Sequence, residues 1–500
     1  MGDISKDLKQ TRQTVDAMLE NCADILVRPL QVGKGKKLNC LLVYIEVAVS
    51  NMMLEDSVIG KLLNRLLDME EQEIYGALEQ NRLGISDAKE LATMQEAMAA
   101  MFAGNAVLFV DGYDKAIKIG SKGYPGIGVR KSESEKVMRG SLESFCESFK
   151  LNTALVRKRI RSGKLKVEEK TVGKYSQTMT ALLYLEGVVY PPICRELKER
   201  LDAFEIDGVE DSGVIEHLTE NSRRTILPLY QTTERPDRAA QALLEGRAVL
   251  LTDNSPEALI FPATGNTLFQ TSDDYYRHFW IVSFLRMVRY VAAFLAVTLP
   301  GIYVAATTFH TQLLPGNLIR SMAEARSGVP FPAVVEVLLM ELSFELLREA
   351  GLRMPGPIGN TIGIVGGLIV GQAAVSANLV SPITVVIAAL TALGSFSIPN
   401  EELSEAFRLV KYGVLFFSTC FGILGVLFGW IFLLIHMASL KSYGIPWLFP
   451  FSGGDLNEGA DGRDSFVRAS MGRLNRRPIF AQRNNRVRFR WKDRKHGEKF

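Results

Sequence analysis

The chain has 500 residues, a formal net charge of +3 and 23% charged residues, values that on average describe a soluble protein. The average hides a division, because the residues before about Phe279 are charged and mixed whereas Phe279 to Met437 is largely apolar. The five cysteines form no CxxC pair, which argues against a zinc site and favours free thiols over a disulfide framework. Met1 to Glu20 is polar, so we expect no cleaved leader and a cytoplasmic N-terminus.

The first part of the chain predicts an α/β unit. Met1 to Val32 has the pattern of polar amphipathic helices, and LNCLLVYIEVAV, which begins at Leu38, alternates like a strand. Helical patterns follow at Met53 to Leu78 and at Asp87 to Phe102. AVLFVDGYDKAIKI then predicts two short strands joined by a hairpin turn at its Asp-Gly pair.

The same order of patterns recurs later in the chain. TALLYLEGVV matches LLVYIEVAV, and Glu186 lies 140 positions after Glu46. GRAVLLTDNSPEALIF matches GNAVLFVDGYDKAIKI, and Asp253 lies 142 positions after Asp111. Because the two offsets are nearly equal, the sequence predicts an internally duplicated α/β unit. Each match is short, and chance similarity is the alternative.

Arg139 to Leu165 lies between the two copies and is predicted to form one long helix. Four cations crowd near its end: Arg157, Lys158, Arg159 and Arg161. A nucleic-acid patch would need an aromatic stacking series or a basic domain around these cations, and the sequence offers neither. We therefore expect no nucleic-acid binding.

Four apolar segments are candidate membrane spans, since a crossing takes about 20 apolar residues. They are Val288 to Phe309, Ile358 to Leu379, Ile383 to Ile398 and Tyr412 to Met437. With both chain ends in the cytoplasm, the positive-inside rule places the acidic loop Glu401 to Glu405 outside.

The segment PGPIGNTIGIVGGLIVGQAAVSANLVSP repeats glycine at every fourth position from Gly359. A helix would align four of these glycines on one ridge: Gly359, Gly363, Gly367 and Gly371. Such small residues let helix backbones approach closely in lipid. The ridge is therefore predicted either to pack inside one subunit or to lie at a subunit interface or a pore.

Pro330 to Ala350 is helical in pattern but carries carboxylates along one side. Three of them are candidate ion-path carboxylates: Glu336, Glu341 and Glu345. Ionisable groups at membrane depth usually face a cavity or an ion path. The alternative is an amphipathic helix at the membrane surface with its carboxylates in water, and the sequence leaves both open.

The chain ends in a basic tail, with thirteen Lys or Arg and three Asp or Glu from Arg463 to Phe500. This excess predicts a cytoplasmic location and attraction to anionic membrane lipids, and RNA binding is the lesser alternative. The expected domains are a first cytoplasmic α/β unit (1–130), a connecting basic helical region (131–177), a second cytoplasmic α/β unit (178–278), a transmembrane domain of about four helices (279–450) and the basic tail (451–500).

Together these pieces resemble the A-subunit family of bacterial spore germinant receptors, the GerA type. The residues that carry the resemblance are NTALVRKRIRSGKL from Asn152, FELLREAGLRMPGPIGNTIGIVGGLIVGQAAVSANLVSP from Phe344, and DSFVR and RRP in the tail. The resemblance runs from about Leu38 to Asn484, and the very basic end beyond it departs from the family pattern. SpoVAF-like members share these motifs, so an accessory germination channel subunit is an alternative.

The resemblance implies a multi-pass protein of the cell membrane or the spore inner membrane, active in nutrient-triggered germination after sporulation. It implies partners, namely a transporter-like B subunit and a lipoprotein C subunit, and a homo-oligomer that conducts ions when a nutrient binds.

Two other classes of protein fit the residues less well. A membrane solute transporter should show inverted repeats in its membrane half, whereas the duplication here lies in the polar half. An enzyme should bring a nucleophile, base or metal ligands together, but the five histidines are scattered and no HExxH, GxSxG or CxxC motif occurs. We therefore expect no catalytic activity and no cofactor.

Overall fold

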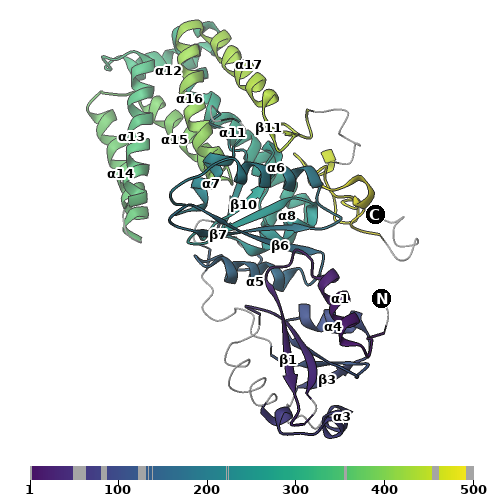
Figure 1. Ribbon diagram of the computed structural model, residues 1–500. Coiled ribbons are helices and arrows are strands. Elements are labelled where there is room, and N and C mark those ends of the chain that lie inside the picture. The colour runs from purple at the N-terminus through teal and green to yellow at the C-terminus, as the bar shows by residue number, and fades with distance from the viewer. Residues whose placement is uncertain are drawn as a thin grey trace. The chain divides into compact units, whose positions relative to one another are not determined.

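The computed structural model describes residues 3–35, 37–48, 64–79, 87–121, 131–132, 135–137, 139–220, 222, 225–353, 357–452 and 461–490, with side chains except at 352–365 and 368. These residues fall into two compact units. The α/β unit comprises Met1–Arg223, Tyr230–Pro262 and Met471–Phe500, and the helical unit comprises Arg224–Leu229 and Ala263–Ser470. Figure 1 shows the elements of each unit.

The α/β unit begins with a five-stranded antiparallel sheet in the order β1-β2-β4-β5-β3. Its strands are β1 (Ile25–Val32), β2 (Leu38–Ile45), β3 (Ala88–Leu91), β4 (Ala106–Val110) and β5 (Ala116–Ile119). The helices of its described residues are α1 (Leu8–Met18), α3 (Glu71–Glu79) and α4 (Met94–Phe102). Alternate residues of β2 point to opposite faces, and both faces are buried, one under α1 and α4 and the other under α3.

A second five-stranded sheet in the same unit has the order β6-β7-β9-β10-β8. Its strands are β6 (Leu165–Val172), β7 (Thr178–Leu185), β8 (Gln231–Thr233), β9 (Ala248–Thr252) and β10 (Ala258–Phe261). Its helices are α5 (Phe149–Arg159), α6 (Pro191–Asp202), α7 (Ser212–Thr219) and α8 (Pro236–Glu245). The core of this half joins β6, β7, β9 and β10 to α5 and α8.

The two sheets have the same strand order and the same register. Leu42 pairs with Leu108 in the first sheet, and Leu182 pairs with Leu250 in the second, so the offsets found in the sequence recur as strand pairs. The matched aspartates also have the same role. Asp111 accepts a hydrogen bond from the first backbone N–H of α1 (3.2 Å), and Asp253 accepts one from the first N–H of α5 (3.2 Å). The predicted internal duplication is therefore present in the fold.

Several predicted helices are wrong at their ends, because strands were missed. The last eight residues of Met1 to Val32 form strand β1, and Asp87 to Phe102 begins with strand β3 before α4. Arg139 to Leu165 is not one long helix, since α5 covers only its middle. The side chain of Asn152 explains where α5 begins, because it bonds both the N–H (2.8 Å) and the C=O (2.5 Å) of Cys146 and holds that residue outside the helix.

The end of the described chain belongs to the α/β unit. Ala481 forms a β-bridge with Val189, and the N–H of Gln482 donates to the carbonyl of Val188 (2.8 Å). Arg477 donates to the carbonyls of Leu244 (2.7 Å), Asn485 and Val487. The short η5 (Arg483–Asn485) follows this contact. This part of the predicted basic tail is thus packed on the protein.

In its described residues the helical unit contains seven longer helices: α11 (Phe279–Thr308), α12 (Gly316–Arg326), α13 (Ala333–Arg353), α14 (Pro357–Ser376), α15 (Pro382–Phe396), α16 (Glu401–Phe421) and α17 (Ile423–Ser439). Its short elements are α9 (Gly265–Leu268), α10 (Asp273–Tyr276), η2 (Thr311–Leu313), β11 (Lys441–Ser442), β12 (Ile445–Pro446) and η4 (Asp461–Arg463). Within this unit α13 lies beside α14 and α16 beside α17 (Figure 1).

Among the described residues, one helix, α11, is both long and apolar enough to cross a membrane, and α15 and α17 are shorter apolar helices. The fourth predicted span, Tyr412 to Met437, is wrong as a single helix. Gly422 adopts a left-handed φ of 61°, which ends α16 and turns the chain into α17. The predicted loop Glu401 to Glu405 is also wrong, because these residues form the first turn of α16, whose N-cap is Asn400. Four spans therefore stay a prediction.

Candidate functional site

The three carboxylates predicted from the sequence all lie on α13, and each has polar partners in the helical unit. Glu336 is fully buried and accepts hydrogen bonds from Arg326 Nε (3.1 Å), the Ser381 N–H (2.8 Å) and Thr384 Oγ1 (2.9 Å). Ser381 is the N-cap of α15, so the Glu336 carboxylate sits at the positive end of that helix. Tyr303 of α11 adds a hydroxyl contact to Thr384 (3.1 Å). Glu336 thus connects α13 to α12 and α15, and Thr384 extends this network to α11.

Glu341 and Glu345 instead contact the cations of α16. Lys411 Nζ lies 2.6 Å from Glu341 Oε2 and 3.9 Å from Glu345 Oε1. The side chains of Glu341 and Lys411 are each only 3% exposed. Glu345 is bonded in addition by Arg408 (3.2 Å) and Arg348 (3.3 Å). The structure therefore brings two of the candidate carboxylates together around one ammonium group.

The predicted glycine ridge is described in part. Gly359 and Gly363 lie in α14 but outside the residues with described side chains. A Cβ added at Gly367 would contact Phe344 of α13 (3.6 Å), and one at Gly371 would contact Val385 of α15 (3.4 Å). At these two positions α14 therefore packs against helices of its own unit. The role of the ridge at an interface or a pore stays a prediction.

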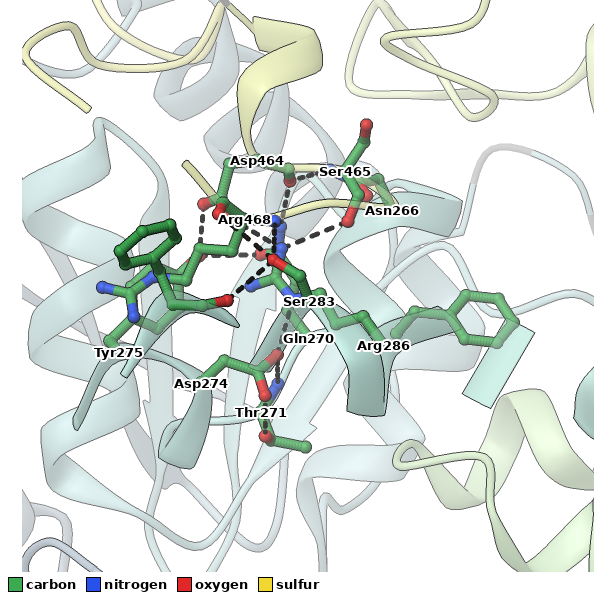
Figure 2. Close-up of polar contacts among 12 residues, drawn as sticks. Asn266, Gln270, Thr271, Asp274, Tyr275, Ser283, Arg286, Asp464, Ser465 and Arg468 are labelled. Atoms are coloured by element: carbon green, nitrogen blue, oxygen red, sulfur yellow. Dashed lines mark hydrogen bonds and ion pairs between the residues drawn. The ribbon is translucent and has the colours of Figure 1, made fainter. Parts of the chain in front are cut away.

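A second charged cluster, which the sequence analysis did not identify, lies where α11 begins (Figure 2). Arg286 of α11 is 1% exposed and donates from Nε to Asp274 (2.8 Å) and from Nη1 to Asp464 (2.7 Å). Arg289, one turn further along α11, donates from both Nη atoms to Asp274 (3.0 Å each). Two cations of the apolar helix are thus neutralised by Asp274, which precedes the helix, and by Asp464, which lies 178 positions after Arg286.

The segment around Asp464 is held by further bonds to the helical unit. Its carboxylate accepts the Tyr275 hydroxyl (2.7 Å), and its carbonyl accepts the side-chain amides of Asn266 (3.0 Å) and Gln270 (2.8 Å). Ser283 of α11 accepts a hydrogen bond from the N–H of Arg468 (3.1 Å). Figure 2 shows that the DSFVR residues Asp464, Ser465 and Arg468 converge on α11.

Charge controls the ionisation of Asp274, which lies outside the apolar helix. Burial raises the pKa of its carboxyl, but the guanidinium groups of Arg286 and Arg289 outweigh burial and bring the pKa below the ordinary value. Asp274 is therefore a charged group at neutral pH despite its 1% exposure. Sequence signals for this cluster existed, since two arginines at the head of an apolar helix require partners.

The outward faces of the helices expose large apolar side chains. Among them are Phe284 of α11 (62% exposed), Phe396 of α15 (68%), Phe416 of α16 (66%) and Ile435 of α17 (61%). Several charged residues of the same unit are instead buried in ion pairs, as the pairs above show. A unit with paired charges inside and bare aromatic and aliphatic side chains outside is suited to a lipid environment.

The basic end of α5 does not form an open patch. Arg157 is fully buried and makes a two-pronged ion pair with Asp24 (2.9 and 2.7 Å). Lys158 and Arg159 both contact Glu143. These contacts join parts of the α/β unit, so three of the four cations considered for nucleic acid have internal partners. Within the described ranges no group of three or more His, Cys, Asp or Glu could hold a metal ion.

Comparison with known proteins identifies the family of this chain. The model of the Bacillus/Clostridium GerA spore germination protein family matches residues 13–480. The chain belongs to the GerA family. The match includes both the α/β unit and the helical unit, and it contains the carboxylates of α13 and the Asp464 cluster.

Several relatives of this GerA-family chain are similar over nearly their whole length. A Bacillus subtilis protein described as the uncharacterized membrane protein YfkQ is 39% identical, covering 96% of this chain and 93% of its own. Spore germination protein B1 of B. subtilis is 35% identical, covering 95% and 97%. The crystal structure of the N-terminal domain of the A subunit of the Bacillus megaterium spore germinant receptor GerK3 matches 52% of this chain and 97% of that domain, at 26% identity and a TM-score of 0.42.

Proposed function

We propose that this chain is the A-type membrane subunit of a nutrient-sensing spore germinant receptor. The observation that carries the proposal is the GerA-family match, which runs through the α/β unit and the helical unit alike. Relatives named as spore germination proteins share 30–36% identity with it, which supports a role in germination. The protein would reside in the spore inner membrane.

The helical unit is proposed to be the ion-conducting part of the receptor. Glu336, Glu341 and Glu345 supply carboxylates inside a unit whose outer face is apolar, an arrangement typical of ion pathways in membrane proteins. The small residues Gly367 and Gly371 allow close helix packing, which a conducting bundle requires. The proposed assembly is a homo-oligomer, with a transporter-like B subunit that senses the nutrient and a lipoprotein C subunit.

Both chain ends are proposed to lie in the cytoplasm. The proposal is supported by the polar α/β unit, to which both the first and the last described residues belong. Cysteines are introduced at Glu401 and Met471 to report on which side of the membrane each position lies. The background carries Cys420→Ser, because Cys420 is exposed and would react as well. An impermeant thiol reagent applied to intact cells should spare Met471→Cys; its labelling there would contradict the proposal.

Cation flux through reconstituted protein tests the conducting role. The full chain is placed in liposomes alone and together with the B and C subunits, and K⁺ release is followed with and without nutrient. Nutrient-dependent release in the three-subunit vesicles supports the proposal. Absence of release in every combination, from protein shown to be folded and inserted, would overturn it.

A further inference from the structure

The pair formed by Glu341 and Lys411 has a feature that an ordinary structural ion pair lacks. Lys411 Nζ bonds only one oxygen of Glu341, Oε2. The other oxygen, Oε1, is buried and has no hydrogen-bond partner in the described part of the chain. The whole Glu341 residue is 2% exposed. A buried carboxylate oxygen left without a partner is costly, so its presence calls for an explanation.

The position of the Lys411 ammonium group explains why this oxygen has no partner. Lys411 Nζ lies 2.6 Å from Glu341 and 3.9 Å from Glu345, between two carboxylates that are one helical turn apart on α13. A dehydrated monovalent cation would be held by the same carboxylate oxygens. Lys411 also extends from a different helix, α16, so its ammonium can leave the carboxylates without any change in α13.

We infer that Lys411 is a tethered cation that occupies a monovalent-cation site formed by Glu341 and Glu345. When the ammonium is in place the site is filled and closed. When α16 withdraws it, the two carboxylates, including the free Glu341 oxygen, accept a small cation from solution. This inference rests on the proposed conducting function and adds to it the element that closes the path.

The alternative is a structural contact that only fastens α13 to α16. The two explanations differ in the double variant Glu341→Gln/Lys411→Met. If the contact only fastens the two helices, it is lost equally in the double variant and in Lys411→Met alone. A cation site, in contrast, is present in Lys411→Met, where the Glu341 carboxylate is unpaired, and is removed in the double variant.

Binding is measured first, in a way that does not depend on conduction. The full chain is purified in detergent, and its melting temperature is compared in KCl and in choline chloride of equal ionic strength, which keeps screening constant. The melting temperature of Lys411→Met should rise with KCl concentration and not with choline, because a ligand of the folded state stabilises it. Wild type, whose site is filled by Lys411, and the double variant should show no difference between the two salts.

An equal response of Lys411→Met to both salts would overturn the inference. If Lys411→Met does not yield folded protein, Lys411→Gln, which keeps a donor for Glu341, is measured in the same salts with the same criteria. A K⁺-specific rise that persists in the double variant would also overturn it, since the carboxylate would then not be the ligand.

Flux separates this inference from the proposed function. In liposomes with the B and C subunits and without nutrient, K⁺ release by Lys411→Met should be at least roughly tenfold faster than release by wild type. Removing Lys411 leaves the Glu341 carboxylate buried without its partner, which strongly disfavours the closed state. Wild-type flux that depends on nutrient, with an unchanged rate in Lys411→Met, would overturn only the tethered cation. Lack of flux from wild type would overturn the proposed function, while the K⁺-specific melting shift would still show the site.

Discussion

The cluster at the head of α11 predicts a large effect from one atom replacement, Asp274→Asn. The Asp274 carboxylate accepts three charge-assisted hydrogen bonds, one from Arg286 and two from Arg289, and it is 1% exposed. The amide of asparagine has almost the same shape but no charge, so the buried Arg286 would keep only the Asp464 carboxylate as its acidic partner. Leaving a buried charge short of its partner costs about 3–5 kcal/mol of stability.

The free energy is read as a melting temperature of the purified full chain in detergent. For a unit of this size, about 3–5 kcal/mol corresponds to a decrease of roughly 6–20 °C. Asp273→Asn is the matched control. The Asp273 carboxylate lies 3.7 Å from Arg277 and is more exposed than that of Asp274, and such partly exposed pairs contribute about 1 kcal/mol or less. Equal melting temperatures for Asp274→Asn and Asp273→Asn would refute the reasoning that the cluster fastens the segment around Asp464 to α11.

Three further predictions concern the pH dependence of the Asp274 contacts and the packing of two helix glycines. The stability difference between wild type and Asp274→Asn should be constant from pH 7 to 5 and shrink only below about pH 4. The pKa of Asp274 is lower in the folded protein than in the unfolded chain, so its carboxylate stabilises the fold above the unfolded pKa of about 3.9 and loses this effect as the pH falls through the folded pKa. A stability difference already lost at pH 6 would contradict this. Gly425→Ala should reduce the amount of folded protein in the membrane, as measured by blotting, because its Cβ would overlap the backbone of α16. Gly413→Ala is the control and should not reduce it, since the space around Gly413 is open. Equal abundance of the two variants would argue against the close packing of α17 on α16. In Gly367→Ala the added Cβ makes only an ordinary contact with Phe344 at 3.6 Å, so the amount of this variant in the membrane should be normal. An unchanged nutrient dose response of cation release would argue against a gating role of the glycine ridge.

The central strands of both sheets could be predicted from the sequence, and the edge strands could not. Strands β2, β4, β7 and β9 are almost continuous apolar runs because both of their faces are buried. The missed strands are β1, β3, β6 and β8, and the same two positions were missed in each copy. Three of them are rich in polar residues, such as LKVEEKTV in β6, and the apolar run of β1 is interrupted by Arg28, Pro29 and Gln31. All four become strands by pairing with a neighbour nearer the centre of the sheet.

The helix break at Gly422 and the cluster around Arg286 were missed for different reasons. An apolar run as long as Tyr412 to Met437 fits one helix or two, and hydropathy cannot separate these cases, although Gly422, Gly425 and Gly429 were a local signal for a close turn. Asp464 lies 178 positions from Arg286, so no local pattern could pair them. The α13 carboxylates were found because a charge in an apolar helix is visible in the sequence, whereas their partners on α16 were not.

The central claim is that this chain is a germinant-receptor subunit, and germination of spores that lack its gene tests it most directly. The gene is deleted in a spore-former without paralogous receptors, and spores are exposed to single nutrients while cation release is recorded. We predict normal sporulation, a lost response to at least one nutrient, and full recovery when the wild-type gene is restored. An undiminished response to every nutrient in the deletion strain would contradict the account.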